Sequence, residues 1–174
     1  NLDAIACGDH AASFILGRSH EEYLIKKLQQ HTGCPVTFPS KAIAKLLNNK
    51  NCQKILLVSP YSKNITKKFI TYLEECEITT TASISLEALD EVQINSLSSS
   101  SLTRIISEFV ENGYANADLL VIAGGGISFS EEIMRVETIL GLPVLTAVGA
   151  LVKDAIELTG ENYTKNGLGR IFSN

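Results

Sequence analysis

The sequence predicts an α/β protein with parallel sheets flanked by helices, built as two lobes related by a pseudo-two-fold axis. Short apolar runs alternate with amphipathic helical patterns along the chain, which is typical of βαβ units in a parallel sheet. One strand–turn–helix–strand–helix unit also occurs twice. Two related units of this kind pack most simply about a two-fold axis.

Six short apolar runs are the predicted strands, at residues 4–7, 36–38, 54–59, 78–83, 119–123 and 144–146. Most helical patterns follow a serine that can cap a helix; the candidate caps are Ser19, Ser40, Ser62, Ser100 or Ser101, and Ser130. The last helix is expected near residues 148–158. The serine-rich stretch 96–101 is expected to be a loop that leads into a helix cap.

The repeat consists of matched motifs. Each copy has an acid before a strand, a glycine-containing turn, a Ser-Phe pair, two adjacent glutamates and a Gly-x-Pro-Val segment. The matched segments are 3–9 with 118–124, 13–14 with 128–129, 21–22 with 131–132, and 33–36 with 141–144. Chance similarity between two βα units is the alternative explanation.

The repeat also predicts where a ligand binds. We assign residues 1–52 plus 147–174 to a first lobe, incomplete at its N-terminal side, and residues 53–146 to a second lobe. Ligands of open parallel sheets bind beyond the carboxyl ends of the strands. We therefore expect a cleft between the lobes, with Asp9 and Gly124 at matching places on opposite walls.

Composition excludes several classes of protein. The chain has 174 residues, of which 45% are apolar and 20% charged, so it is not a disordered tail, a coiled coil or a collagen. The net charge of -4 and the pI near 5.4 give no basic surface for nucleic acid. No apolar run approaches the roughly 18 residues of a membrane span. We expect neither a nucleic acid nor a membrane partner.

Cysteine and histidine usage predicts no metal site. The four cysteines occur singly, without a Cys-x-x-Cys pair, and the three histidines are scattered. This usage favours reduced thiols in a cytoplasmic protein.

The turn after the first strand, residues 8–13, contains small residues around one acid–base pair. Asp9 and His10 are the candidate catalytic groups, and the backbone amides of Ala11, Ala12 and Ser13 can approach an anion closely. The alternative is that Asp9 is a turn or cap residue and His10 an exposed neighbour.

Two further turns carry candidate binding residues. Gly124, Gly125 and Gly126 expose main-chain N–H groups without side-chain bulk, although the segment is neither a dinucleotide fingerprint nor a P-loop. The alternative is a loose connection. Tyr61 and Ser62 follow the strand at 54–59, where a phenol can reach the cleft. The alternative for Tyr61 is packing on a helix start.

With these motifs the chain resembles the aspartate/glutamate racemase superfamily, and within it the branch of maleate isomerase and arylmalonate decarboxylase. The matching segments are 3–14, 33–47, 55–61, 118–126 and 141–150. The resemblance implies a cofactor-independent isomerase or lyase that acts on a small carboxylate or dicarboxylate through an enolate-like intermediate. It also implies a homo-oligomer, and a leading strand and loop with no counterpart before Asn1.

The chain departs from this branch at its two cysteines. Asp9 and Gly124 stand at the two cysteine positions, and Cys7 lies inside the predicted strand, so the cysteine mechanism does not carry over. Asp9 is then the expected proton carrier, with His10 beside it. The amides of both turns and the Tyr61 hydroxyl resemble the family's carboxylate holes. One acid–base face favours decarboxylation or one-sided proton transfer over racemisation.

Three hypotheses follow. The chain is an isomerase or decarboxylase without the usual cysteines, or a degenerate member that only binds a small carboxylate. In the third hypothesis it is one part of an assembly and needs a missing leading segment or a partner chain.

Overall fold

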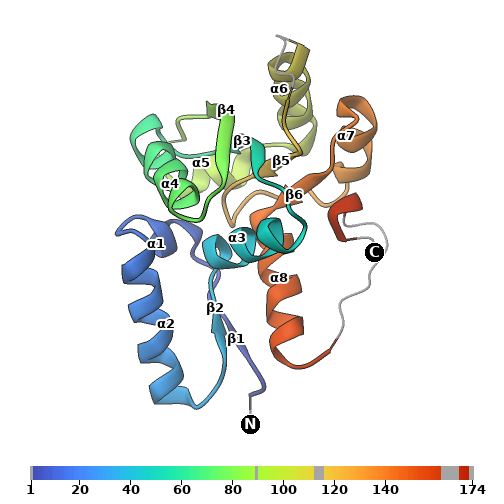
Figure 1. Cartoon of the computed structure of the whole chain (residues 1–174). Coiled ribbons are helices and arrows are strands. Elements are labelled where there is room, and N and C mark those ends of the chain that lie inside the picture. The colour runs from blue at the N-terminus through green and yellow to red at the C-terminus, as the bar shows by residue number, and fades with distance from the viewer. Residues whose placement is uncertain (1, 89, 112–115, 162–168, 173–174) are drawn as a thin grey trace.

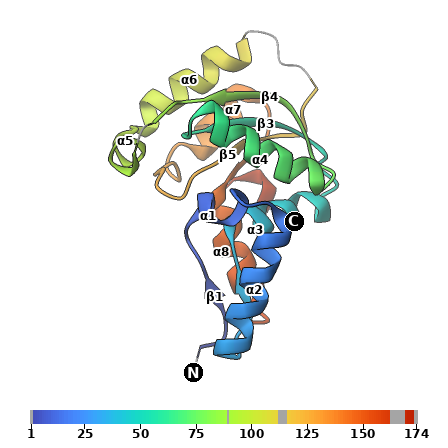
Figure 2. The same ribbon diagram turned by 90° about the vertical axis from the view of Figure 1, so that its left-hand side faces the viewer.

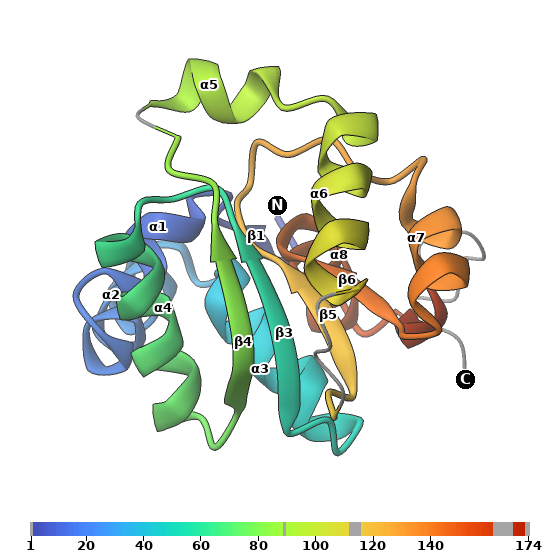
Figure 3. The ribbon, with the colours of Figure 1, turned by 90° about the horizontal axis from the view of Figure 1, so that it is seen from above.

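The computed structural model describes residues 2–88, 90–111, 116–161 and 169–172. Within these ranges, six parallel strands form two separate sheets (Figures 1 and 3). The small sheet pairs β1 (Ile5–Ala6) with β2 (Val36–Thr37). The large sheet has the order β4 (Thr79–Ser85), β3 (Lys54–Ser59), β5 (Leu119–Ile122), β6 (Val144–Thr146). All six predicted strands are confirmed, although β1 and β2 are shorter than expected.

Helices connect and cover the strands. They are α1 (His10–Phe14), α2 (Arg18–Thr32), α3 (Pro39–Asn49), α4 (Lys63–Glu75), α5 (Glu91–Ser96), α6 (Ser99–Glu111), α7 (Ile133–Leu140) and α8 (Ala147–Leu158), followed by a 3-10 turn at Arg170–Phe172. None of the helices in the described ranges is long and apolar enough to cross a membrane.

Some helix starts differ from the prediction. Ser62 caps α4 as expected, since its hydroxyl accepts a hydrogen bond from the amide of Ile65. The predicted caps Ser19, Ser40 and Ser130 are wrong, because α2 begins after Gly17, α3 begins with Pro39 and α7 begins after Glu132. Proline suits the first helical turn, where a missing N–H leaves no bond unmade. The sequence did not predict α1 or α5.

Both copies of the repeat have the same local geometry. α2 and α7 each end on a glycine in the left-handed conformation, Gly33 with φ 70° and Gly141 with φ 69°. A proline then leads into β2 or β6. The carbonyl of this proline accepts an equivalent hydrogen bond from the neighbouring strand in each copy. The amide of Ile5 donates to Pro35 at 2.8 Å, and the amide of Leu120 donates to Pro143 at 2.9 Å. The matched sequence segments therefore have the same local backbone geometry in both copies.

Helices cover both faces of the large sheet (Figure 2). α3, α4 and α8 pack on the face that carries Leu57 and Val121, whereas α6 and α7 pack on the face that carries Leu56 and Leu120. Successive side chains of a strand point to opposite faces, so a sheet covered on both sides needs continuous apolar strands. That need explains the uninterrupted apolar runs in β3 and β5.

The small sheet lies on the other side of α3 and α8 (Figure 1). Its outer cover is α2, whose Ile25 packs with Val36. Asp154 of α8 connects the small sheet with α3. Its carboxylate accepts hydrogen bonds from Thr37 of β2 and from Lys45 of α3, both at 2.5 Å. After β2 the chain passes from the small sheet to the large one. The division into lobes at residues 1–52 plus 147–174 and 53–146 stays a prediction.

Candidate active site

A cleft of about 680 Å³ is lined by the turns that directly follow β1, β3 and β5, together with residues around α5. This is the side of a parallel sheet where ligands bind. Eight of the ten predicted site residues line it: Asp9, His10, Ala11, Tyr61, Ser62, Gly124, Gly125 and Gly126. Ala12 and Ser13 do not. The acid–histidine turn and the triple-glycine turn therefore open onto one cleft.

The triple-glycine turn is tightly packed rather than a loose connection. Gly124 has φ 98°, and a Cβ at this position would lie 2.7 Å from Cγ of Pro60, so a side chain is excluded on both counts. A Cβ at Gly125 would lie 2.9 Å from the carbonyl oxygen of Gly8. The two turns of the repeat thus meet backbone to backbone, and the exposed Gly125 and Gly126 present main-chain atoms to the cleft.

Asp9 is the N-cap of α1. Its Oδ1 accepts a hydrogen bond from the amide of Ala12 at 3.0 Å, and the carboxylate remains exposed on the cleft. The cap interpretation is therefore confirmed. It also means that the amide of Ala12 already has a partner in this chain and is not free to bind an anion.

Ser13 points away from the cleft. The short helix α1 turns its hydroxyl inward, where it donates to the carbonyl of His10 at 2.7 Å and shares a hydrogen bond of 2.5 Å with Ser40 of α3. Both serines are buried. The predicted anion cradle used the backbone amide of Ser13, and this part of the prediction is wrong because Ser13 does not line the cleft. Ser40 joins two helices instead of capping one.

His10 is buried and joins the two turns. Only 2% of its surface is exposed, and its ring packs against Phe14 and Phe69, with centroids 5.1 and 4.6 Å away. The amide of Gly124 donates to Nδ1 at 3.0 Å, which assigns the ring proton to Nε2. Burial lowers the pKa of His10 to about 3, so the ring is neutral near pH 7. His10 is neither an exposed neighbour nor a ready proton donor.

Tyr61 reaches the cleft from the end of β3. Its hydroxyl lies 3.5 Å from Nδ1 of His10. Burial, and after it the negative charge of Asp9, raises the pKa of Tyr61 above its ordinary value. The phenol therefore keeps its proton near pH 7 and can donate a hydrogen bond to a ligand. Ser62 lines the cleft beside it while capping α4.

Residues around α5 line the cleft and were missed from the sequence. They are Ala88, Asp90, Ile94 and Asn95. Asp90 is the N-cap of α5 and accepts from the amide of Gln93 at 2.9 Å. An aspartate followed three residues later by glutamine resembles a capping box, which was the available signal for this helix.

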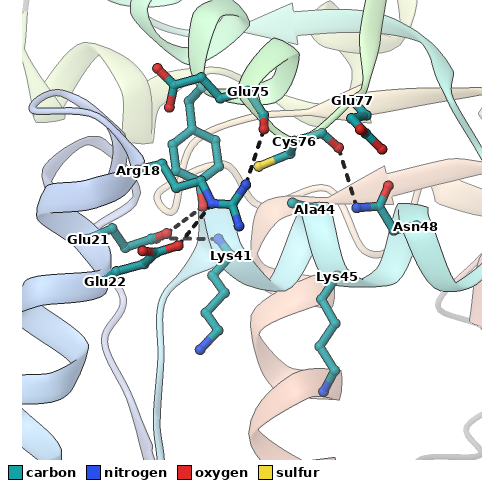
Figure 4. A pocket seen from close by; sticks show the side chains of 11 residues that line it. Arg18, Glu21, Glu22, Lys41, Ala44, Lys45, Asn48, Glu75, Cys76 and Glu77 are labelled. Carbon is teal, nitrogen blue, oxygen red and sulfur yellow. Dashed lines mark hydrogen bonds and ion pairs between the residues drawn. The ribbon is translucent and has the colours of Figure 1, made fainter.

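A second hollow of about 380 Å³ lies between α2, α3 and the end of α4 (Figure 4). Buried Glu21 connects these helices, since it accepts hydrogen bonds from the hydroxyl of Tyr72 and from the amide of Lys41. Burial raises the pKa of Glu21, although these hydrogen bonds oppose the shift. Arg18 bonds Glu22 and the carbonyl of Glu75. Arg18 and Glu22 form an ion pair of 3.0 Å inside the hollow, and Glu21 is held by two hydrogen bonds, as in a structural contact.

The described residues contain no cluster of three or more His, Cys, Asp or Glu placed to hold a metal ion. Cys7 does not line the cleft, and burial raises the pKa of its thiol. Raised pKa values disfavour the thiolate that acts as a nucleophile. Cys7 is therefore not a substitute for a catalytic cysteine.

Comparison with known proteins gives the family. A family model described as arylmalonate decarboxylase matches residues 2–172. The maleate isomerase of Geobacillus stearothermophilus is 30% identical over 140 residues, 79% of this chain and 55% of that protein. The arylmalonate decarboxylase of Bordetella bronchiseptica is 24% identical over 161 residues, 92% of this chain and 67% of that protein.

Solved structures share the fold. A liganded double mutant of arylmalonate decarboxylase has a TM-score of 0.90 at 23% identity, covering 98% of this chain and 73% of that one. A mutant of the maleate isomerase of Pseudomonas putida S16 with maleate has a TM-score of 0.87 at 17% identity, covering 99% and 70%.

The fold is that of an α/β protein with a cleft where strands of its two sheets end. The chain belongs to the arylmalonate decarboxylase family. The predicted resemblance to this branch of the racemase superfamily is confirmed. The chain spans about half to two thirds of the length of the two curated relatives.

Proposed function

We propose that the cleft is the active site of a cofactor-independent isomerase or decarboxylase, and that it acts on a small carboxylate through an enolate-like intermediate. The observation that supports this most is the meeting of the two repeated turns and Tyr61 around one cleft. Family membership supports the same class of reaction.

Each wall of the cleft has its own proposed role. Tyr61 and the main chain of Gly125 and Gly126 hold the carboxylate and stabilise negative charge as the enolate forms. Asp9 carries the proton to or from the reacting carbon. His10 keeps Gly124 in place, because its Nδ1 accepts the hydrogen bond from the Gly124 amide.

The proposed chemistry is one-sided. In a decarboxylation, the bond to the departing carboxylate breaks, carbon dioxide leaves, and the bonding electrons form the enolate. The protonated form of Asp9 then gives its proton to the enolate carbon, and water returns a proton to the exposed carboxylate. In a proton transfer, Asp9 removes and returns the proton on one face. Gly124, at the opposite position, has no side chain to protonate the other face.

Deuterium exchange tests this proposal. The protein is incubated with small carboxylates in deuterated water, and incorporation of deuterium at carbon is followed by NMR. We expect incorporation by the wild type and by Glu74→Gln, an exposed carboxylate outside the cleft. We expect none by Asp9→Asn, in which asparagine still caps α1. Incorporation by Asp9→Asn at the wild-type rate contradicts the role of Asp9.

A binding protein without turnover is the second candidate function. The replacement of both family cysteines, by Asp9 and Gly124, favours it. Its expected result in the same experiment is saturable binding of a carboxylate without any incorporation of deuterium.

We also propose that the first copy of the repeat is completed by another strand. In the second copy, β5 pairs with β3 as well as with β6, whereas β1 pairs only with β2 within the described ranges. The added strand comes from a leading segment or from a partner chain, including a second copy in a homo-oligomer. Light scattering at several concentrations gives the oligomeric state. Four unpaired cysteines favour a cytoplasmic protein, and we expect no nucleic acid or membrane partner.

A further inference from the structure

The repeated pair of glutamates has different surroundings in the two copies. In the first copy, only 1% of the surface of Glu21 is exposed, whereas its counterpart Glu131 in the second copy is exposed. Moving a carboxylate out of water is costly unless hydrogen bonds or opposite charges compensate for it. The proposed chemistry does not use Glu21, so its burial needs another explanation.

Glu21 belongs to α2 but binds two other helices. Its Oε1 accepts a hydrogen bond from the amide of Lys41, in the first turn of α3, at 3.3 Å (Figure 4). Its Oε2 accepts a hydrogen bond from the hydroxyl of Tyr72 in α4. The two oxygens of one buried carboxylate therefore join α3 to α4.

The helix α1, which carries the acid–histidine turn, depends on the same two helices. It has five residues, and isolated helices shorter than about 12 residues are marginally stable in water. Ser13 of α1 shares a hydrogen bond of 2.5 Å with Ser40 of α3. The ring of Phe14 packs against Phe69 of α4, with centroids 4.9 Å apart. Thus α1 is supported by α3 through one residue and by α4 through another.

Glu21 binds α3 and α4 directly beside these two supports. Lys41 follows Ser40 in α3, and Tyr72 lies three residues after Phe69 in α4. The rings of Phe69 and Tyr72 also stack, with centroids 6.3 Å apart. The contacts of Glu21 therefore set the distance between the two supports, and with it the position of α1.

The position of α1 in turn sets the contact between the two turns of the cleft. Asp9 is the N-cap of α1, and His10 is its first residue. The Nδ1 atom of His10 accepts the hydrogen bond from the Gly124 amide at 3.0 Å, and its ring packs against Phe69. A shift of α1 would move both candidate groups relative to the triple-glycine turn.

We propose that Glu21 is a positioning residue of the cleft, which joins α3 to α4 behind α1 and so holds Asp9 and His10 against the triple-glycine turn. This inference rests on the proposed function, in which Asp9 carries the proton. Glu21 does not line the cleft and takes no part in the proton transfer itself.

Two variants separate positioning from stability. Replacing both partners of a buried polar contact by apolar groups can leave stability nearly unchanged, whereas removing one partner leaves the other unsatisfied. We expect Glu21→Leu combined with Tyr72→Phe to melt close to the wild type, and Tyr72→Phe alone to melt at a clearly lower temperature. In both variants the NMR shifts of the His10 ring nitrogens and of the Gly124 amide should move, although the aromatic ring at position 72 is kept.

Three matched variants are the controls. Glu21→Gln keeps an acceptor oxygen and should stay closer to the wild-type shifts than the double variant. Glu22→Gln changes the exposed member of the same pair and should move neither signal. Ile25→Ala removes a core contact of α2 with the small sheet, so it should lower the melting temperature without moving either signal.

The NMR shifts decide the inference. Unchanged shifts of His10 and Gly124 in Tyr72→Phe and in the double variant overturn it, and so does an equal displacement in Ile25→Ala. If the double variant does not fold, Tyr72→Phe alone gives the same decision.

Titration with maleate adds a functional measurement. We expect the double variant to bind maleate at least about fivefold more weakly than the wild type at a similar melting temperature, because a displaced wall loses its contacts with the ligand. Equal affinities contradict a role of Glu21 in the site. If neither maleate nor other small carboxylates bind the wild type, the proposed function fails, whereas the shifts of His10 and Gly124 still show whether Glu21 holds the two turns together.

Discussion

In the first copy of the repeat, β1 is followed by a short helix that carries Asp9 and His10, whereas in the second copy β5 is followed by three glycines. Asp9 matches Gly124 in the repeat, and His10 matches Gly125. One wall of the cleft therefore presents side-chain chemistry and the other presents main chain. This asymmetry is the physical reason to expect one-sided chemistry rather than racemisation.

The two copies also differ in burial. β5 lies between β3 and β6, and each of its residues is at most 1% exposed. Within the described ranges β1 pairs with β2 alone, and Ala6 is exposed. The second copy thus contributes a fully buried strand to the core, whereas the strand that precedes Asp9 in the first copy is less buried.

The largest expected effect is a difference in stability between matched core positions. Leu120 and Ile5 occupy the same place in the repeat, but Leu120 is fully buried and Ile5 only partly. We expect Leu120→Ala to lower the free energy of unfolding by about 2–5 kcal/mol. Ile5→Ala should cost less than about 2 kcal/mol. Denaturant titration measures both. Equal losses would show that β1 is covered as thoroughly as β5.

Acid sensitivity at His10 is the next effect in size. The pKa of His10 is about 3 in the folded chain against 6.5 ordinarily, so the unfolded chain binds a proton in this range that the folded chain does not. The contribution of neutral His10 to the free energy of unfolding is fully present above pH 6.5 and is lost progressively as the pH decreases toward 3.

Replacing His10 sharpens this point. We expect His10→Asn to lose less stability between pH 7 and pH 4 than the wild type, by roughly a few kcal/mol. Urea titrations at the two pH values provide the measurement. Identical losses in both proteins would mean that His10 titrates normally and is not sequestered between the turns.

A smaller effect separates the two cysteine-equivalent positions. Gly124→Ala adds a side chain at φ 98° and against Pro60, so we expect a loss of about 1–3 kcal/mol. Asp9→Ala removes only a helix cap, at a cost of about 1 kcal/mol. Thermal unfolding of both variants makes the comparison. If Gly124→Ala proves as stable as the wild type, the glycine turn is looser than its contacts indicate.

Much of the fold was predictable because its signals are local. The Gly-x-Pro-Val segments placed a helix end, a proline and a strand in both copies, and the structure has all three. Ser62 was also identified as a cap from its own neighbourhood. The shared cleft followed from the repeat, because equivalent turns end strands whose carboxyl ends face one region.

The roles within the cleft depended on distant contacts and were less predictable. The burial of His10 requires Phe69 of α4 and the amide of Gly124, which are 59 and 114 residues away. Ser13 lies inward because its hydroxyl shares a hydrogen bond with Ser40, 27 residues away in the sequence. The contribution of α5 was missed because six residues give little periodic signal, although the cap at Asp90 marked its start.

The most direct test of the central claim is NMR mapping of a ligand on the ¹⁵N-labelled protein. Titration with maleate should give saturable shifts at the amides of Gly125, Gly126 and Tyr61 and in the first turn, residues 8–11. The account predicts that both turns respond together with one dissociation constant. Shifts confined to the hollow around Arg18, or the absence of saturable shifts in either turn, would contradict it.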